Sequence, residues 1–176
     1  MHTYTCTLTH VHAPNTHPRL MFWTDWGVNP KIERASMDGK QRTILHEKHL
    51  FWPNALTIDY PTHSLYWADS KLHVIESSHV DGSGRRLVIA DVIRHPFAMT
   101  LFEDRLYWTD WETKSVLSTN KGIGRNITEV LGDLIQPMDI HAVHPVRQPQ
   151  GIVCFHGDID EVSKYQRQPK HDIWVC

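Results

Sequence analysis

The chain has 176 residues, 40% of them apolar and 22% charged, with a formal net charge of −2. This length suits one ordinary domain, and the composition is that of a globular protein rather than of a disordered tail, which would carry fewer apolar residues and more net charge. A nucleic-acid-binding protein would usually have a basic surplus, and no apolar run approaches the roughly 20 residues that span a bilayer. We therefore expect neither a nucleic-acid partner nor direct insertion into a membrane.

The two ends of the chain lack the patterns of its middle. Residues 1–18 are rich in histidine and have neither the basic nor the apolar segment of a secretory signal, so we expect an unstructured leader there. Residues 150–176 form a polar stretch that we expect to be a loose tail. The three cysteines lie in these two segments, at Cys6, Cys154 and Cys176. An odd, widely spaced set indicates neither a disulfide framework nor a zinc site.

An aromatic motif recurs three times at a nearly constant spacing. Its copies are Met21–Trp26, Leu65–Asp69 and Leu106–Trp111. The first tryptophan of each copy recurs after 44 and then after 41 residues. A period in the low forties is typical of a four-stranded propeller blade or of a two-helix repeat.

The residues between the motifs decide between these architectures. After each motif come a short alternating run, a turn and a second run beside an arginine; these are Lys31–Ser36, Asp38–Gly39 and Arg42–Leu45, then His73–Ser78, Asp81–Gly82 and Arg86–Ile89, then Ser115–Ser118, Lys121–Gly124 and Arg125–Leu131. Asp-Gly between alternating β-branched runs predicts a hairpin, and its type I′ turn needs positive φ at both central residues. These runs are too short for the helices of a two-helix repeat.

A further strand-like run precedes the second and third motifs, and another copy follows the third unit without an aromatic motif after it. Its copies are Leu56–Asp59, Ala98–Leu101 and Met138–Val143. Each unit is therefore predicted to contain four short antiparallel strands, which is one blade of a propeller. A sandwich of two packed sheets is the alternative for regularly spaced strands.

These motifs resemble the YWTD, or class B, repeats of the low-density lipoprotein receptor family. Other similar segments are Phe51–Tyr60, His95–Asp104, Pro137–His141 and Arg147–Pro149. Over about residues 19–149 the chain is most similar to the first propeller of the agrin-receptor type of receptor-related protein, with the Wnt co-receptors next. In this family six blades close into a ring, which an EGF-like module follows.

The resemblance implies an all-β fold, a partial propeller in which residues 19–149 form about three four-stranded antiparallel blades. Residues 150–176 do not resemble the EGF-like module, so the chain reads as a truncated product of such a receptor. Open blade faces and strand edges favour association, and we expect the isolated chain to be marginally stable or to self-associate. A sharp, cooperative melt of a concentration-independent monomer would contradict this expectation.

The motif residues divide into structural and candidate binding positions. Neighbouring aromatic residues of each copy alternate along the strand and can pack between blades. The aspartates Asp25, Asp69 and Asp110 are expected to accept backbone N–H groups and to fix the turn after the strand. A second tryptophan, at Trp26 and Trp111, stands where the strand leaves the sheet, whereas the middle copy has a serine there. A large aromatic residue at such an exit is typical of a binding hot spot.

The resemblance implies that these positions converge on one propeller face. In the agrin-receptor and Wnt co-receptor propellers this face captures a short Asn-x-Ile-type loop of the ligand. The matching ligand-binding face comprises Trp26, Trp52, Asn54, His95, Phe97, Trp111 and Met138. Asn54 matches an asparagine that is expected to pair with the asparagine of the ligand. Alternatively, these residues only fill the top surface of the ring.

The resemblance therefore implies a non-catalytic ligand-binding module of an extracellular, cell-surface receptor, without cofactor or metal. Its partners would be extracellular protein ligands with agrin-type or Wnt-antagonist-type loops. The sequon that begins at Asn126 is consistent with N-glycosylation of an extracellular domain. The chain has fourteen histidines, a residue type whose ordinary pKa is about 6.5, and we therefore expect ligand binding to be sensitive to acid.

Two other functions stay open. A propeller hydrolase or lactonase would hold an axial metal through carboxylates from several blades. Asp59 and Asp139 recur in the first strands of units, but Phe102 stands where the third carboxylate would be. The remaining alternative is a fragment with no function of its own.

Overall fold

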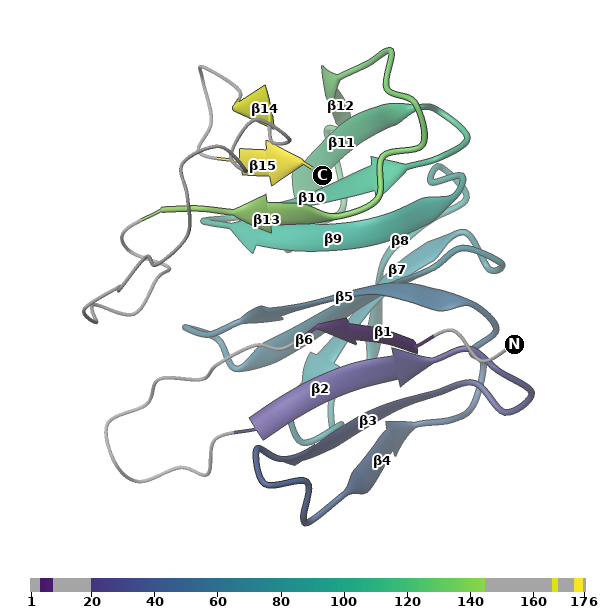
Figure 1. The fold of residues 1–176 in the computed structure, drawn as a ribbon, viewed down its shortest axis with the longest axis vertical. Helices are drawn as coiled ribbons and strands as arrows, with labels where there is room; N and C mark the ends of the chain where they lie inside the picture. Colours follow the sequence, from purple (N-terminus) through teal and green to yellow (C-terminus); the bar gives the residue numbers. More distant parts are fainter. Residues whose placement is uncertain (1–3, 8–19, 145–165, 168–172, 176) are drawn as a thin grey trace, which may run out of the picture.

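The computed structural model describes residues 4–7, 20–144, 166–167 and 173–175. Within these residues all regular structure is β-strand, and no helix is present that could cross a membrane. The strands form antiparallel sheets that follow one another along the chain (Figure 1). The predicted all-β class is therefore confirmed.

The first blade contains a strand that was not predicted from the sequence. Its sheet has the order β1-β2-β3-β4, from β1 (Tyr4–Thr7), β2 (Leu20–Asp25), β3 (Lys31–Ser36) and β4 (Thr43–His46). In the segment expected to be an unstructured leader, β1 pairs with β2 and takes the position that the first strand has in the other blades. Its aromatic and β-branched residues suit a strand, although no motif marks it.

The second and third blades are four-stranded meanders with the predicted order of strands. The second contains β5 (Pro53–Asp59), β6 (Ser64–Asp69), β7 (Val74–His79) and β8 (Arg86–Ala90). The third contains β9 (Pro96–Phe102), β10 (Arg105–Asp110), β11 (Ser115–Asn120) and β12 (Thr128–Leu131). The blades therefore form the partial propeller that the repeat period predicted.

The Asp-Gly hairpins are present, but their turns differ from the expected type I′. Within each Asp-Gly pair only the glycine has positive φ, +78° at Gly39 and +91° at Gly82. In the first hairpin the Gly39 N–H donates to the Ser36 carbonyl at 2.8 Å, and Ser36 N–H donates to Lys40. This is an ordinary turn followed by a left-handed glycine, a common three- to four-residue hairpin connection.

A small fourth sheet follows the third blade. It has the order β13-β15-β14, formed by β13 (Ile140–Ala142), β14 (Gln166–Arg167) and β15 (Ile173–Val175). Ile140 lies opposite Val175 in this pairing. Part of the segment expected to be a loose tail is thus in strands next to the predicted Met138–Val143 run.

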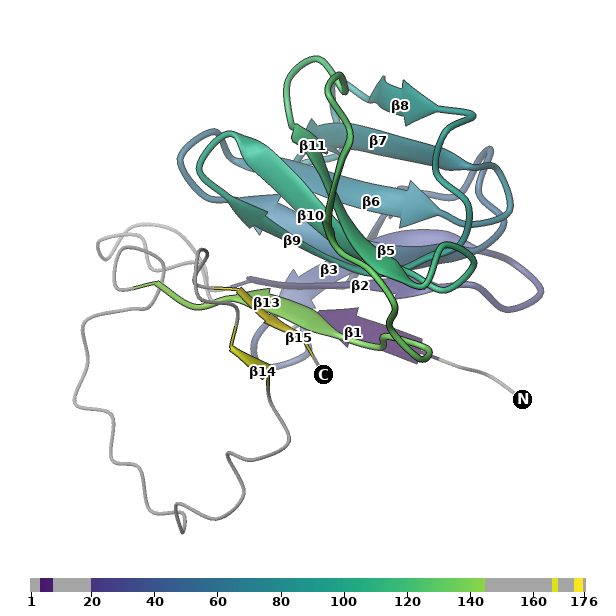
Figure 2. The same cartoon turned by 90° about the horizontal axis from the view of Figure 1, so that it is seen from above.

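Apolar layers between neighbouring blades hold the fold together. Trp67 packs toward the first blade, in a cluster with Phe22 and Ile32, and it has no exposed surface. Its neighbour Tyr66 packs toward the third blade, in a cluster with Trp108. The aromatic pair therefore alternates between the two interfaces of the blade, as predicted. Viewed from above (Figure 2), the three blades lie against one another, with β5 beside β9.

Candidate functional site

Six connections lie at the same end of the blades because alternate turns of an antiparallel meander share an end. They are residues 26–30, 47–52, 70–73, 91–95, 111–114 and 132–139, and we call the surface that they form the loop face. The predicted binding residues all lie in these connections or at the start of the strand that follows; they are Trp26, Trp52, Asn54, His95, Phe97, Trp111 and Met138. The structure therefore places the predicted set on one face.

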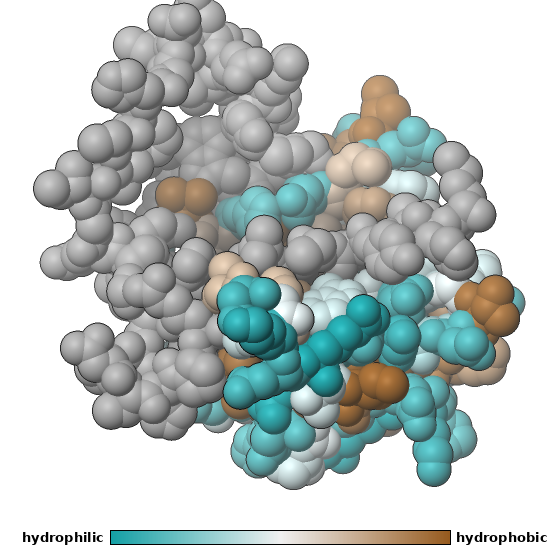
Figure 3. Space-filling model, turned by 60° about the horizontal axis from the view of Figure 1, so that its bottom comes forward, coloured by the Kyte–Doolittle hydropathy of each residue, from teal (hydrophilic) through white to brown (hydrophobic). Residues whose placement is uncertain are grey.

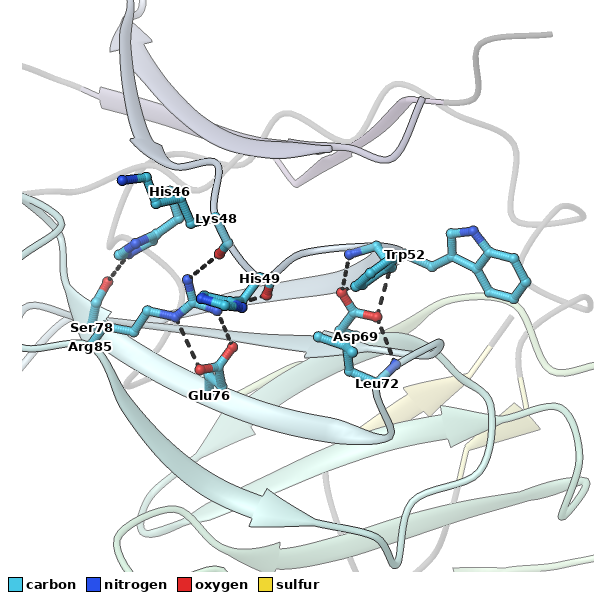
Figure 4. Close-up of polar contacts among 10 residues, drawn as sticks. His46, Lys48, His49, Trp52, Asp69, Leu72, Glu76, Ser78 and Arg85 are labelled. Carbon is cyan, nitrogen blue, oxygen red and sulfur yellow. Dashed lines mark hydrogen bonds and ion pairs between the residues drawn. The ribbon is translucent and has the colours of Figure 1, made fainter. Parts of the chain in front are cut away.

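The aspartate of the second motif fixes two of these connections at once. One carboxylate oxygen of Asp69 accepts the N–H groups of Phe51 at 2.7 Å and Trp52 at 3.2 Å. The other oxygen accepts the N–H groups of Lys71 at 3.0 Å and of Leu72 at 3.1 Å, the latter labelled in Figure 4. The predicted structural role of this aspartate is confirmed, and it extends from the turn after its own strand to the linker between blades.

The third motif repeats this arrangement. Asp110 accepts the N–H groups of Arg94 at 3.1 Å and His95 at 2.9 Å, and its other oxygen accepts those of Glu112 and Thr113. In the first motif, Asp25 accepts the N–H of Gly27. All three carboxylates thus serve as backbone acceptors.

Three of the predicted residues form one aromatic stack; His95 ends the linker that enters the third blade, and Phe97 and Trp111 belong to that blade. The Trp111 ring lies parallel to Phe97, with 4.6 Å between ring centroids, and to His95, at 5.5 Å. Its indole N–H donates to the Pro137 carbonyl at 2.8 Å. The ring is therefore fixed in orientation before any ligand arrives.

A second aromatic pair lies at the junction of the first and second blades. Trp26 meets Trp52 edge-on, with 6.4 Å between ring centroids. The Lys71 ammonium lies 5.4 Å from the centroid of the Trp52 ring, within range of a cation–π contact. Trp52 is 40% exposed, so a broad aromatic surface remains open to a partner.

Asn54 is buried between the second and third blades, with only 7% of its surface exposed. Its side-chain N–H groups donate to Ser70 Oγ at 2.8 Å and to the Pro96 carbonyl at 3.2 Å. Ser70 donates to the same carbonyl at 2.6 Å. Both amide protons are thus committed within the chain, and a pairing with a ligand would rely on the Oδ1 atom of Asn54.

Further apolar residues stand exposed on the loop face, beyond those predicted from the sequence. They are Val28, Phe51, Val92 and Ile135, beside the predicted Trp52 and Met138. Figure 3, which brings the bottom of Figure 1 forward, shows a described surface that is mainly hydrophilic, with apolar residues set apart from one another. Single exposed apolar residues are ordinary in proteins, so these four do not by themselves mark a contact surface. No motif distinguishes these four in the sequence.

The two carboxylates of the hydrolase alternative do not share a site. Asp59 ends β5 at the side opposite the loop face, where it is buried and pairs with Lys121 Nζ at 2.7 Å. It borders a cavity of about 470 Å³ that also contacts Phe102. Asp139 lies on the loop face and pairs with His141 at 2.8 Å. Within the described ranges, no three metal-binding side chains gather.

His46 gives a testable dependence of stability on pH. Its ring is buried against Trp67, with 4.8 Å between centroids, and Nε2 lies 3.0 Å from Ser78 Oγ. Burial lowers the pKa of His46 from its ordinary 6.5, the Arg85 charge lowers this pKa further, and Glu76 opposes both. Because the unfolded chain takes up the proton more readily, the free energy of unfolding should fall as the pH drops below 6.5. Urea unfolding at several pH values measures this slope.

One variant separates this effect from that of the other histidines. His46→Gln should flatten the acid slope of the unfolding free energy, since the titrating group is gone. The hydrogen bond that His141 donates to the Asp139 carboxylate raises the pKa of His141, so the small, solvent-screened contribution of His141 to stability acts in the opposite direction. The stabilising contribution of His141 is complete below pH 6.5 and disappears as the pH rises through the raised pKa that His141 has in the folded chain. An unchanged acid slope in His46→Gln would contradict the assignment.

The predicted sequon lies far along the chain from the loop-face residues of the first two blades. Asn126 is exposed in the connection between β11 and β12, with φ of +59°. Thr128 begins β12, and its hydroxyl contacts Arg105 at 2.8 Å and Ser118 at 3.0 Å.

Comparison with known proteins agrees with this architecture. A family model for the low-density lipoprotein receptor repeat class B matches residues 19–60 and 64–103. The vitellogenin receptor of Solenopsis invicta is 42% identical over 129 residues, which is 73% of this chain and 7% of that receptor. The chain therefore spans about 7% of the length of this relative.

Solved structures contain the same fold. A chain from the crystal structure of a nidogen/laminin complex matches with a TM-score of 0.62 and 28% identity, over 69% of this chain and 47% of that one. A gluconolactonase from Xanthomonas campestris matches with a TM-score of 0.59 over 72% of this chain and 48% of that one, but at 14% identity the likeness concerns the fold alone. The repeated motif, the four-stranded blades and the family match together show that the chain belongs to the low-density lipoprotein receptor class B, or YWTD, repeat family.

Proposed function

We propose that this chain is a non-catalytic module whose loop face binds an extracellular protein ligand. The observation that carries the proposal is the presence of two aromatic clusters on one face, Trp26 with Trp52 and Trp111 with Phe97 and His95. Aromatic residues dominate binding hot spots because they contribute a large contact area at a low cost in conformational entropy. A ligand could place apolar side chains against both clusters.

The ligand segment is a short loop of an extracellular protein. The resemblance to the agrin-receptor and Wnt co-receptor propellers suggests an agrin-type or Wnt-antagonist-type Asn-x-Ile loop. The name of the matching insect receptor adds vitellogenin as a second candidate ligand. A cell-surface, extracellular location accompanies this receptor role.

Truncation of the exposed tryptophan tests the face directly. Trp52→Ala should weaken binding of a cyclic Asn-x-Ile loop peptide by about thirtyfold, or ~2 kcal/mol, because it removes a hot-spot side chain. Isothermal titration calorimetry on the purified chain measures the affinity. Ile123→Ala is the matched control, since Ile123 is 63% exposed in the turn at the opposite end of the blades.

The outcome of this titration distinguishes the face from the ligand. Equal affinities of Trp52→Ala, Trp111→Ala and the unchanged chain would remove the loop face as the binding site. Absence of peptide binding by the unchanged chain, together with Trp52-dependent binding of vitellogenin, would keep the face and replace the ligand.

Glycosylation at Asn126 belongs to the same extracellular proposal. Secretion of the chain from an animal cell behind a heterologous signal should yield a product with one N-glycan, because Asn126 is exposed and followed by Thr128 at the acceptor spacing. Thr128→Ala should abolish the mobility shift on treatment with an N-glycosidase, whereas Thr128→Ser should retain it. A glycosidase-insensitive product of the unchanged, secreted chain would contradict this assignment.

A further inference from the structure

Arg85 uses its guanidinium group to join two blades. Its Nε and one terminal nitrogen form a fork with the Glu76 carboxylate, at 3.0 and 2.6 Å. The terminal nitrogens also donate to the carbonyls of Lys48 at 2.6 Å and His49 at 3.0 Å (Figure 4). The group lies 5.3 Å from the centre of the Trp67 ring. A residue of the second blade thus binds the backbone that enters this blade from the first.

The backbone held by Arg85 is the linker that carries Trp52. Arg85 fixes the linker at Lys48 and His49, and Asp69 fixes it at Phe51 and Trp52. His49 has φ of +52°, an unfavourable conformation for a residue with a side chain, so the surrounding contacts must maintain it. The linker is therefore fixed on both sides of this conformation, immediately before Trp52.

The third blade lacks this clamp at the corresponding positions. Glu76 lies opposite Trp67 in the strand pairing, and Leu117 lies opposite Trp108. Arg85 precedes the residue that pairs with Ser77, and Ile127 precedes the residue that pairs with Ser118. Leu117 and Ile127 are partly buried against the core around Trp108, where they replace the ion pair with an apolar one.

The linker before the third blade consequently has different support. It is held by Asp110 at Arg94 and His95, and by His73, whose Nδ1 lies 2.9 Å from the Arg94 carbonyl. No guanidinium contact to this linker is present among the described residues. Of the two linkers that enter the second and third blades, only the one carrying Trp52 is clamped by arginine in the part of the chain that the structure describes.

We propose that Arg85 is a positioning residue for the loop face: it holds the linker of residues 47–52 in the conformation that presents Trp52. The consequence of this clamp for ligand binding rests on the proposed function, whereas its effect on the conformation of the linker does not. The guanidinium fork suits this task because it satisfies a carboxylate and two carbonyls from one rigid plane, which a lysine cannot reproduce.

The third blade supplies the substitution that tests this proposal. Arg85→Ala alone would leave Glu76 partly buried without its partner and could unfold the chain. The double variant Glu76→Leu with Arg85→Ile copies the apolar pair of the third blade and preserves packing. Arg86→Ala is the matched control, because Arg86 is the next residue and donates instead to the Gly122 carbonyl.

Hydrogen exchange read by mass spectrometry measures the linker directly. In the double variant, amides of residues 47–52 should exchange at least about tenfold faster, while those of residues 105–120 keep their rates and the thermal midpoint stays close to that of the unchanged chain. Trypsin should also cleave faster after Lys48. Unchanged exchange in the linker, or equal acceleration in both segments, would overturn the positioning role. Arg86→Ala should leave the linker unaffected.

Peptide affinity completes the test. If the unchanged chain binds the loop peptide, the double variant should bind it at least about fivefold more weakly, because a mobile linker must be ordered on binding. Faster linker exchange with unchanged affinity would overturn the positioning of the binding face. If the unchanged chain does not bind the peptide, the proposed ligand fails, and linker exchange still decides whether Arg85 holds Trp52.

Discussion

Replacing Asp69 with alanine is expected to lower the free energy of unfolding by about 4 kcal/mol, since hydrogen bonds to a buried charge are strong and unpaired buried amides are costly. The side chain is fully buried and accepts four backbone N–H groups, two from the linker before its blade and two from the turn after β6. No other group is positioned to accept all four. Urea unfolding of the purified variant, followed by circular dichroism, measures the loss.

Asp69→Asn is the control that separates the two sides of this carboxylate. The amide retains one oxygen, which can serve only one pair of N–H groups, so the loss should fall to about half of that in the alanine variant. Hydrogen exchange should then show which segment, 51–52 or 71–72, has lost protection. A loss of less than about 1 kcal/mol in Asp69→Ala would contradict the proposed dependence of both connections on this residue.

The repeat determined how much of the fold could be predicted. Strands β2 to β13 follow from the aromatic motif, its period and the alternating runs, because every blade solves the same packing problem with similar residues. Strand β1 has no such signal: Tyr4–Thr7 is short, lies in a histidine-rich segment and is joined to its partner β2 by a long connection rather than by a tight turn. Pairing of this kind depends on tertiary contacts, which local propensity does not report.

Features of the candidate site that depend on a residue's position along a strand could be predicted from the sequence. Features that depend on contacts with residues from other segments could not. Trp26 and Trp111 could be assigned to the loop face because they follow a strand of known direction. The burial of Asn54 could not be predicted, since it results from Ser70 in another connection and from the Pro96 carbonyl at the start of β9. The clamp by Arg85 has the same cause: its carbonyl partners carry no side-chain signature in the sequence.

Gly124 is a second position where one substitution should have a large effect. Gly124→Ala is expected to lower the free energy of unfolding by about 4 kcal/mol, through a left-handed backbone that alanine disfavours and a clash in a filled space. Its φ is +59°, and an added Cβ would lie 2.0 Å from the Val88 carbonyl oxygen and 2.8 Å from Ile89 Cγ1. The turn after β11 therefore touches the backbone of β8, and relief would require the second and third blades to separate.

Gly39→Ala isolates the backbone contribution to this effect. Gly39 also has positive φ, +78°, but nothing lies within 4 Å of the position that its Cβ would take. Its substitution should therefore cost only the conformational penalty, about 1 kcal/mol. The difference between the two variants in urea unfolding then reports the contact between blades. Similar losses at both positions would show that the turn moves away from β8 at little cost, and that the interface between these blades yields more easily than its buried apolar layer implies.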